Sequence, residues 1–397
     1  MDLGFEGGFE VREACASGIL KPQHQRPGWV RVPRTGFKTV LACDIMRAAE
    51  AAWISYFGSR DSFIRKSVVD LVKDVREGLF KFPQADVVTG GFPCNDFSLS
   101  GLRGGFDSSF SHNGGKLSGE PTEESRGMLY MWMKEVVSLV LPRVFVAENV
   151  GGIASLAGVK KTIESDFSSA GSGYEVVTMR LRADDYGVPQ TRDRVFFIGL
   201  RKDCLSSGVD LSLIKPKPTS FSNPVPCSAV LCDLPEPEDS QDLSQCSYSK
   251  AAYIPEKITV EEVNKGFGGS DLFDAETKDV KVFKCQSQGQ SEVDLNKPGP
   301  TIRSEHHGNI EFRRLSEEHG GRYAAELSVG LPERRLTVRE CARIQTFPDD
   351  FEFVRTKDPK LSGSDGYKLI GNAVPPLLAF RIAWNLCEVW DRVFDQS

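Results

Sequence analysis

The 397-residue sequence has 40% hydrophobic and 26% charged residues, a composition typical of globular proteins, which excludes a disordered or fibrous chain. Its formal net charge of -6 argues against a protein that coats nucleic acid through bulk electrostatics, although arginines gather locally. No apolar run approaches the ~20 residues of a membrane span, and the 10 cysteines stand at irregular intervals without a CxxC pair. We therefore expect a cytoplasmic protein with reduced thiols, outside the membrane.

Short apolar runs alternate with helical patterns along the first 200 residues. Five runs predict strands buried on both faces, at residues 40–44, 67–70, 86–89, 144–148 and 195–199. The clearest helix is predicted from Met128 to Leu141, where Pro142 ends it. This alternation predicts an α/β fold with a doubly wound, mostly parallel sheet, whose ligands bind at the carboxyl ends of the strands.

One cysteine stands in a rigid turn directly after the predicted strand 86–89. The segment reads Gly91-Phe92-Pro93-Cys94, so proline restricts the backbone before the thiol and glycine admits close approach of another group. Taken alone, Cys94 is open to interpretation as a buried core residue, since free cysteine is among the most buried residue types. A thiol at the carboxyl end of a strand also suits a covalent catalyst.

The character of the chain changes between Arg201 and Asn296, where prolines, serines and acidic residues are frequent. This stretch predicts a separate module or a long ordered insertion. Regular alternation then returns, with a predicted helix over 336–344 and a last helix from Pro376. The chain is thus expected to leave its first domain and return to it, with boundaries at 1–200, 201–296 (or extending to about 335) and 336–397.

Three further motifs follow the cysteine. They are Glu148-Asn149-Val150 at the end of a predicted strand, Gln190-Thr191-Arg192-Asp193-Arg194 before another, and Gly371-Asn372-Ala373-Val374-Pro375-Pro376 at the start of the last helix. With the Pro-Cys loop and an Arg-Glu-rich helix, they stand in the order of the DNA cytosine-5 methyltransferase family, which the chain resembles as far as Leu378. The resemblance implies the S-adenosylmethionine-dependent methyltransferase fold, with a smaller, irregular target-recognition domain at 201–296.

By this resemblance Cys94 is the nucleophile that adds to carbon 6 of a flipped cytosine, which makes carbon 5 reactive toward a methyl group. Glu148 would donate a proton or a strong hydrogen bond to ring nitrogen 3. Arg194 and Arg192 would hold the oxygen at position 2 through their guanidinium donors. For Arg192, phosphate binding stays open as an alternative.

The implied methyl donor is S-adenosyl-L-methionine, and no metal is expected. Asp44 matches the acid that binds the ribose hydroxyls, and Asp70 matches the acid that receives the adenine amino group. Four more residues would line or close the same cleft: Phe92, Pro93, Asn372 and Val374.

The chain departs from the family pattern at its start, where the family has a strand followed by a Phe-x-Gly-x-Gly loop that cradles the donor. Two explanations stay open. In the first, the start codon was placed too late and the natural protein has an extra strand. In the second, Gly4, Gly7 and Gly8 form a shortened loop. We favour the first, because a missing strand leaves a central sheet edge unpaired. Asn95 stands where the family usually has glutamine, and residues 13–39 form an insertion without an assigned role.

The sequence therefore predicts a DNA (cytosine-5-)-methyltransferase of the bacterial restriction-modification type. It would act as a nucleoid-associated monomer on a specific double-stranded DNA sequence. Two settings stay open: a companion restriction endonuclease that acts on the same site without direct contact, or a solitary enzyme. The alternative is a DNA-binding pseudoenzyme or a truncated, inactive methyltransferase. Arg339 and Glu340 are predicted to pair with each other and brace the hinge between domains.

Overall fold

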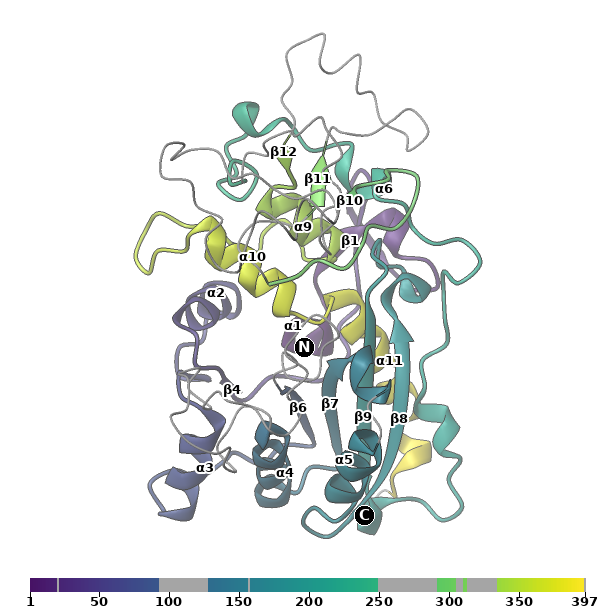
Figure 1. Ribbon diagram of the computed structural model, residues 1–397. Helices are drawn as coiled ribbons and strands as arrows, with labels where there is room; N and C mark the ends of the chain where they lie inside the picture. Colours follow the sequence, from purple (N-terminus) through teal and green to yellow (C-terminus); the bar gives the residue numbers. More distant parts are fainter. Residues whose placement is uncertain are drawn as a thin grey trace, which may run out of the picture.

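The computed structural model describes residues 1–19, 21–92, 128–155, 158–248, 291–304, 310–312 and 334–395 (Figure 1). The predicted nucleophile Cys94 and its neighbours Pro93 and Asn95 lie outside these ranges, as do residues 249–290 of the predicted recognition region. None of the described helices combines the length and the apolar character that crossing a bilayer requires.

A four-stranded sheet forms the centre of the fold. Its order is β6 (Val87–Gly91), β7 (Val144–Val150), β9 (Asp193–Arg201) and β8 (Tyr174–Arg182). β6 and β7 are parallel, whereas β9 is antiparallel to both of its neighbours. β4 (Ala42–Cys43) and β5 (Phe63–Ile64) form a separate parallel pair. The predicted α/β class is confirmed, but the sheet is mixed where a mostly parallel one was predicted.

Alternate residues of β7 point to opposite faces of the sheet and enter two different cores. Val144 and Val146 pack with residues of α1 (Asp2–Glu6) and α11 (Pro376–Val393). Phe145 and Ala147 pack with α4 (Leu129–Val140) and α5 (Val159–Ser168), which lie in front of the sheet in Figure 1. Burial on both faces explains why this strand reads as a continuous apolar run.

The predicted strand at 67–70 is wrong, because these residues begin helix α3 (Val68–Arg76). The Ser67 side chain caps the helix by accepting a hydrogen bond from the Val69 N–H at 3.2 Å. Val69 and Val72 are buried on one side, as in an amphipathic helix. Asp70 therefore lies in the first turn of a helix and does not follow a strand.

The glycines near the start of the chain serve packing and a turn. Gly4 lies inside α1, and a Cβ atom there would lie 2.4 Å from the Pro376 carbonyl oxygen, so glycine permits the contact between α1 and α11. Gly7 and Gly8 have φ angles of 65° and 74° and turn the chain after the helix. Gly4 thus belongs to a helix and not to a loop, whereas Gly7 and Gly8 lie in a turn.

The insertion at 13–39 contributes to a small antiparallel sheet that the sequence did not predict. Its order is β1 (Glu10–Arg12), β3 (Trp29–Arg31) and β2 (Gln23–Arg26). The Trp29 ring is buried against the guanidinium groups of Arg26 at 4.1 Å, Arg343 at 5.0 Å and Arg12 at 5.2 Å. The contact with Arg343 joins the sheet to the C-terminal part of the chain.

The C-terminal helix α11 shares a core with α1 and with one face of the central sheet. α9 (Val338–Ile344) and α10 (Gly363–Asn372) precede α11, so the Gly-Asn-Ala-Val-Pro-Pro motif links two helices instead of starting one. Ile214, Val225 and Leu231, from the first part of the predicted recognition region, share a core with α11. The remaining helices and strands are α2 (Arg47–Phe57), α6 (Ser228–Leu231), β10 (Ser291–Glu292), β11 (Ile310–Phe312) and β12 (Arg334–Arg335).

Arg339 and Glu340 do not pair with each other. Glu340 binds Arg334 through two contacts of 2.8 Å and also closes a capping box with Thr337, whereas Arg339 binds Asp242 at 2.5 Å. Replacing Glu340 with alanine is expected to lower the free energy of unfolding by about 3–5 kcal/mol, because Arg334 would stay buried without its carboxylate.

Urea unfolding monitored by circular dichroism measures this loss. The exposed pair of Arg76 and Glu135, with a contact of 2.6 Å, provides the control: Glu135→Ala should cost less than about 1 kcal/mol. Equal losses in the two variants would contradict the role of the buried pair.

Candidate active site

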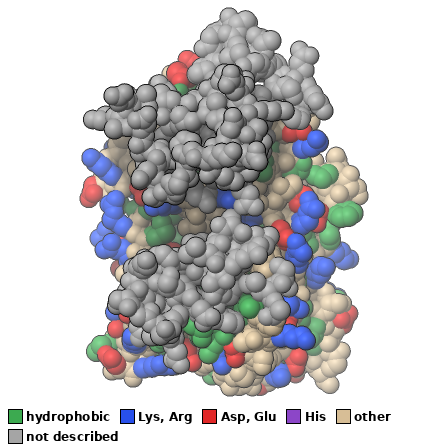
Figure 2. Space-filling view, in the orientation of Figure 1, with side chains coloured by type: hydrophobic (Ala, Val, Ile, Leu, Met, Phe, Trp, Pro, Cys, Tyr) green, Lys and Arg blue, Asp and Glu red, His purple; other side chains and the backbone are tan. Residues whose placement is uncertain are grey.

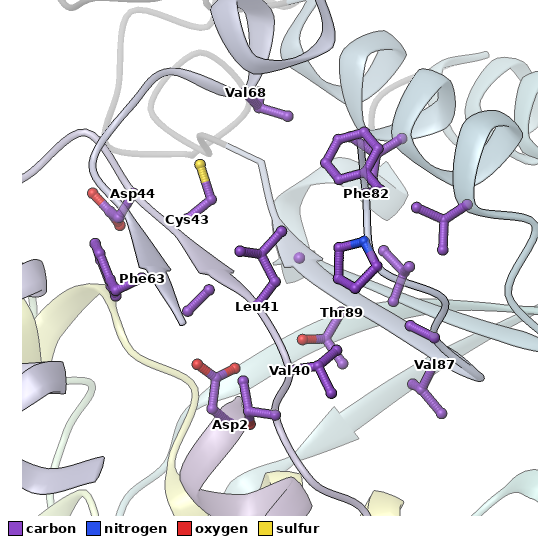
Figure 3. A pocket seen from close by; sticks show the side chains of 18 of the residues that line it. Asp2, Val40, Leu41, Cys43, Asp44, Phe63, Val68, Phe82, Val87 and Thr89 are labelled. Atoms are coloured by element: carbon purple, nitrogen blue, oxygen red, sulfur yellow. The ribbon is translucent and has the colours of Figure 1, made fainter. Parts of the chain in front are cut away.

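A cavity of about 790 Å³ lies between β4 and β6, the edge strands of the two sheets. In Figure 3, Val40 and Leu41 face Val87 and Thr89 across it. Its size falls within the range of about 300–1,000 Å³ that is usual for small-molecule sites. Ligands of α/β sheets bind at the carboxyl ends of the strands, so a ligand would bind at the end of the cavity that follows β4 and β6.

Asp44 lies at this end, directly after β4, as the sequence predicted. Burial raises the pKa of its carboxyl group, while the backbone N–H of Met46, 2.7 Å from Oδ1, acts in the opposite direction. Hydroxyl groups of a ligand would stabilise the carboxylate further. Phe92, which ends the described part of the nucleophile loop, also lines the cavity.

Asp70 is not among the described residues that line the cavity. Ser67, Val68 and Leu71 hold that part of the wall, because α3 turns Asp70 away from it. The sequence did carry a signal for this arrangement: a serine before an apolar run with helical spacing is a typical helix start. The predicted adenine contact of Asp70 is therefore corrected, and Ser67 and Val68 take its place on the wall.

Asn372 and Val374 do not line the cavity either. Asn372 is exposed at the end of α10, and Val374 is buried in the core that contains α11. The Gln345 side chain donates hydrogen bonds to the carbonyl oxygens of Ile370 at 2.7 Å and Ala373 at 3.3 Å. These bonds fix the motif against α9, which explains why it does not close the cavity.

Glu148 and Arg194 form an ion pair beside the last residue of β6. Arg194 Nε lies 2.7 Å from Glu148 Oε1, and both side chains are only 11–12% exposed. A Cβ atom on Gly91 would lie 3.1 Å from Glu148 Oε2, so glycine leaves room for the carboxylate. The pairing follows from the sheet register, in which Gly91 is opposite Glu148 and Val150 is opposite Arg194.

Asn149 ties this pair to the nucleophile loop. It is fully buried, and its Nδ2 atom donates a hydrogen bond to the Phe92 carbonyl oxygen at 3.1 Å. Its Oδ1 atom accepts a hydrogen bond from the Val150 N–H at 2.8 Å. Asn149 thus fixes the backbone two residues before Cys94, at the same end of the sheet as Glu148.

Arg192 does not join the pair. Its two terminal nitrogens donate to the carbonyl oxygens of Ile302 and Gly371, each at 2.7 Å, and the residue is 1% exposed. Its head group is committed to the backbone, which argues against both predicted roles, contact with the base and contact with phosphate. The physical reason is that Arg192 precedes β9, so it does not share a strand face with Arg194.

The described residues hold no group of three or more His, Cys, Asp or Glu side chains that could bind a metal ion. In the face shown in Figure 2, Lys and Arg side chains are interspersed with Asp and Glu side chains. This mixed surface agrees with the net charge of -6.

The chain matches the family model described as C-5 cytosine-specific DNA methylase over residues 30–388. Among curated proteins it is similar to the type II methyltransferase M.BbvI of Brevibacillus brevis, with 30% identity over 80% of this chain and 72% of the relative. M.BspRI of Lysinibacillus sphaericus is also 30% identical, over 98% of this chain and 79% of the relative.

Solved structures share the fold at lower identity. A DNMT2 variant of Spodoptera frugiperda aligns with a TM-score of 0.54 and 16% identity, over 89% of this chain and 93% of that one. The Entamoeba histolytica methyltransferase EhMeth aligns with a TM-score of 0.52 and 14% identity, over 88% and 90% of the two chains. The chain belongs to the C-5 cytosine-specific DNA methylases, as a DNA (cytosine-5-)-methyltransferase of the type II restriction-modification class.

Proposed function

We propose that this protein transfers a methyl group from S-adenosyl-L-methionine to carbon 5 of cytosine in a specific double-stranded DNA sequence, through a covalent bond between Cys94 and carbon 6. One observation supports this most directly. The partly buried pair of Glu148 and Arg194 lies at the end of the sheet where Asn149 holds the backbone that leads to Cys94. A nucleophile, a proton donor and a cation thus come from adjacent strand ends.

The chemistry assigns a step to each residue. The Cys94 thiolate forms a bond to carbon 6, and the electron pair of the 5,6 double bond moves into the ring, where Glu148 supplies a proton or a strong hydrogen bond at nitrogen 3. Arg194 holds the oxygen at position 2 and stabilises its developing charge. Carbon 5 takes the methyl group from the sulfonium sulfur of the donor, which would leave S-adenosyl-L-homocysteine as the by-product. Carbon 5 then loses its proton, the electron pair restores the 5,6 double bond, and the bond between sulfur and carbon 6 breaks to release Cys94.

The cavity end between β4 and β6 suits the donor. The Asp44 carboxylate would accept hydrogen bonds from the ribose hydroxyls, and the Phe92 ring would pack against the adenosine. When bound, S-adenosyl-L-methionine supplies an electrophilic methyl group on its sulfonium sulfur. The rest of the lining combines apolar residues such as Val40 and Val87 with charged ones such as Asp2 and Lys38.

Replacing Asp44 with asparagine is expected to raise the KM for the donor by about 10- to 100-fold, because a charge-assisted hydrogen bond contributes about 1.5–3 kcal/mol. The value of kcat should change much less, since Asp44 does not touch the base. Steady-state methyl transfer with a labelled donor measures both constants. Asp70→Asn is the matched control and should leave both constants near the wild-type values; the reverse pattern would restore Asp70 as the adenine ligand.

The target base must leave the helix, because the thiol approaches carbon 6 from the face of the ring and stacked neighbours cover that face. Residues 201–296 would read the DNA sequence, because this region lies between the motifs assigned to the catalytic domain. A companion endonuclease would cut the same sequence when it is unmethylated, without contacting this protein.

A mechanism-based trap tests the proposal. The gene is expressed in a host that lacks cytosine methylation, and bisulfite sequencing identifies the modified sequence. Duplex DNA with 5-fluorocytosine at that site is then incubated with protein and labelled donor, because fluorine at carbon 5 prevents the release of Cys94. A covalent complex that carries label supports the proposal. DNA binding without a complex and without methylated sites would identify a DNA-binding pseudoenzyme.

A further inference from the structure

A buried network of side-chain amides joins the strand that carries Arg194 to two C-terminal segments. Gln190 and Gln345 are both fully buried, and Gln190 Nε2 donates to Gln345 Oε1 at 2.8 Å. Gln190 Oε1 in turn accepts a hydrogen bond from the Ile302 N–H at 3.0 Å. Both polar atoms of the Gln190 amide and the Gln345 Oε1 atom therefore have hydrogen-bond partners, as buried amide groups usually do.

The backbone around Gln190 pairs with residues 299–302, which follow the predicted recognition region. The Thr191 N–H donates to the Gly299 carbonyl at 2.8 Å, and the Gly299 N–H donates to the Pro189 carbonyl at 3.0 Å. Thr301 Oγ1 adds a hydrogen bond to the Thr191 carbonyl at 2.9 Å. The two segments are thus joined by an isolated parallel β-bridge between Gln190 and Gly299, directly before β9 and Arg194.

Gln345 binds Gln190 from the side opposite residues 299–302. It ends α9 and holds the carbonyls of Ile370 and Ala373, next to Gly371, whose carbonyl binds Arg192. Movement of Gln345 would release Gln190 and the start of β9 together. The Arg194 head group, four residues beyond Gln190, would then lose its fixed place against Glu148.

We propose that Gln345 is a positioning residue for cytosine methylation, which acts through Gln190 on the Arg194–Glu148 pair. This inference rests on the proposed function. An error of about 1 Å in the placement of a group that assists catalysis lowers the rate by up to about 100-fold, so the effect should appear in the covalent step. DNA affinity should change little, because neither amide is exposed to a ligand.

The test compares Gln345→Leu with Tyr174→Phe. Tyr174 is also fully buried, and its hydroxyl donates a hydrogen bond to the Pro142 carbonyl oxygen at 2.8 Å, at the end of the sheet opposite Arg194. Three quantities are measured: the single-turnover rate of the covalent complex with 5-fluorocytosine DNA, the Kd for unmodified DNA, and the melting temperature.

We expect Gln345→Leu to slow the covalent step by about 10- to 100-fold with a Kd within about threefold of wild type. Tyr174→Phe also removes a buried hydrogen bond, so it should lower the melting temperature as well, but it should slow the step by less than about threefold. The inference is overturned if both variants slow the step equally, or if Gln345→Leu does not slow it. If Gln345→Leu does not fold, Gln345→Asn, with a shorter amide arm, is read by the same criteria.

The double variant of Gln190→Leu and Gln345→Leu adds an independent criterion. If the two amides act as one unit, the double variant should be no slower than the slower single variant. Additive losses would overturn the relay through Gln190. A wild-type protein that forms no covalent complex would refute the proposed function itself, and this result differs from every outcome that concerns Gln345.

Discussion

Replacing Cys94 with serine is expected to lower methyl transfer by on the order of 10⁴-fold or more, the scale seen when a covalent nucleophile is removed. A serine hydroxyl is far less acidic than a thiol and does not supply an anion for addition to carbon 6. Non-covalent binding of the DNA sequence should persist, because the substitution only replaces the sulfur atom with oxygen. Denaturing gels with 5-fluorocytosine DNA measure the complex, and labelled donor measures transfer.

Cys43 provides the matched control for this experiment. It is a described thiol at the polar end of the cavity, but desolvation by the surrounding protein raises its pKa to about 11, so it is protonated at neutral pH. Burial raises the pKa of Cys15 and Cys227 further, to about 12. Cys43→Ser should therefore leave the covalent complex intact. A complex that survives in Cys94→Ser and disappears in Cys43→Ser would move the nucleophile to β4.

Two of the strands that the sequence predicted, β7 and β9, are buried on both faces, whereas β4 and β6 are at most partly buried. β7 and the centre of β9 are continuous apolar runs, since helices cover both sides of the sheet. β8 was missed because its outer position alternates apolar residues with Glu175, Arg180 and Arg182. The run at 67–70 was misread because two valines suit a strand, whereas the helical spacing becomes visible only with Leu71 and Val72.

In the candidate site, too, the sequence predicts the residues better than their long-range contacts. Motif order alone identified Glu148 and Arg194, and the register of β7 against β9 brings them together. Arg192 stands only two residues from Arg194, and its separate role depends on contacts with Ile302 and Gly371, more than 100 positions away. The sheet around Trp29 depends on similarly distant arginines. Such contacts leave no local pattern in the sequence.

Glu148→Gln is expected to lower the rate of the covalent step by about 10²- to 10⁴-fold, the usual contribution of general acid catalysis. The substitution is conservative in structure, because the glutamine oxygen can still accept the hydrogen bond from Arg194 Nε that now measures 2.7 Å. A glutamine amide can also donate a hydrogen bond to nitrogen 3, but it has no proton to transfer. The loss therefore measures proton donation separately from hydrogen bonding. Single-turnover trapping with 5-fluorocytosine DNA gives the rate.

Glu175→Gln serves as the control, since Glu175 binds Lys202 at 3.3 Å at the opposite end of the sheet. Its rate should equal that of the wild type. If Glu148→Gln forms the complex at nearly the wild-type rate, hydrogen bonding at nitrogen 3 suffices and Glu148 is not the acid. Arg194→Lys keeps the positive charge but loses the planar guanidinium that would hold both the carboxylate and the base oxygen. If this variant and Glu148→Gln are equally slow, the two side chains act as one unit.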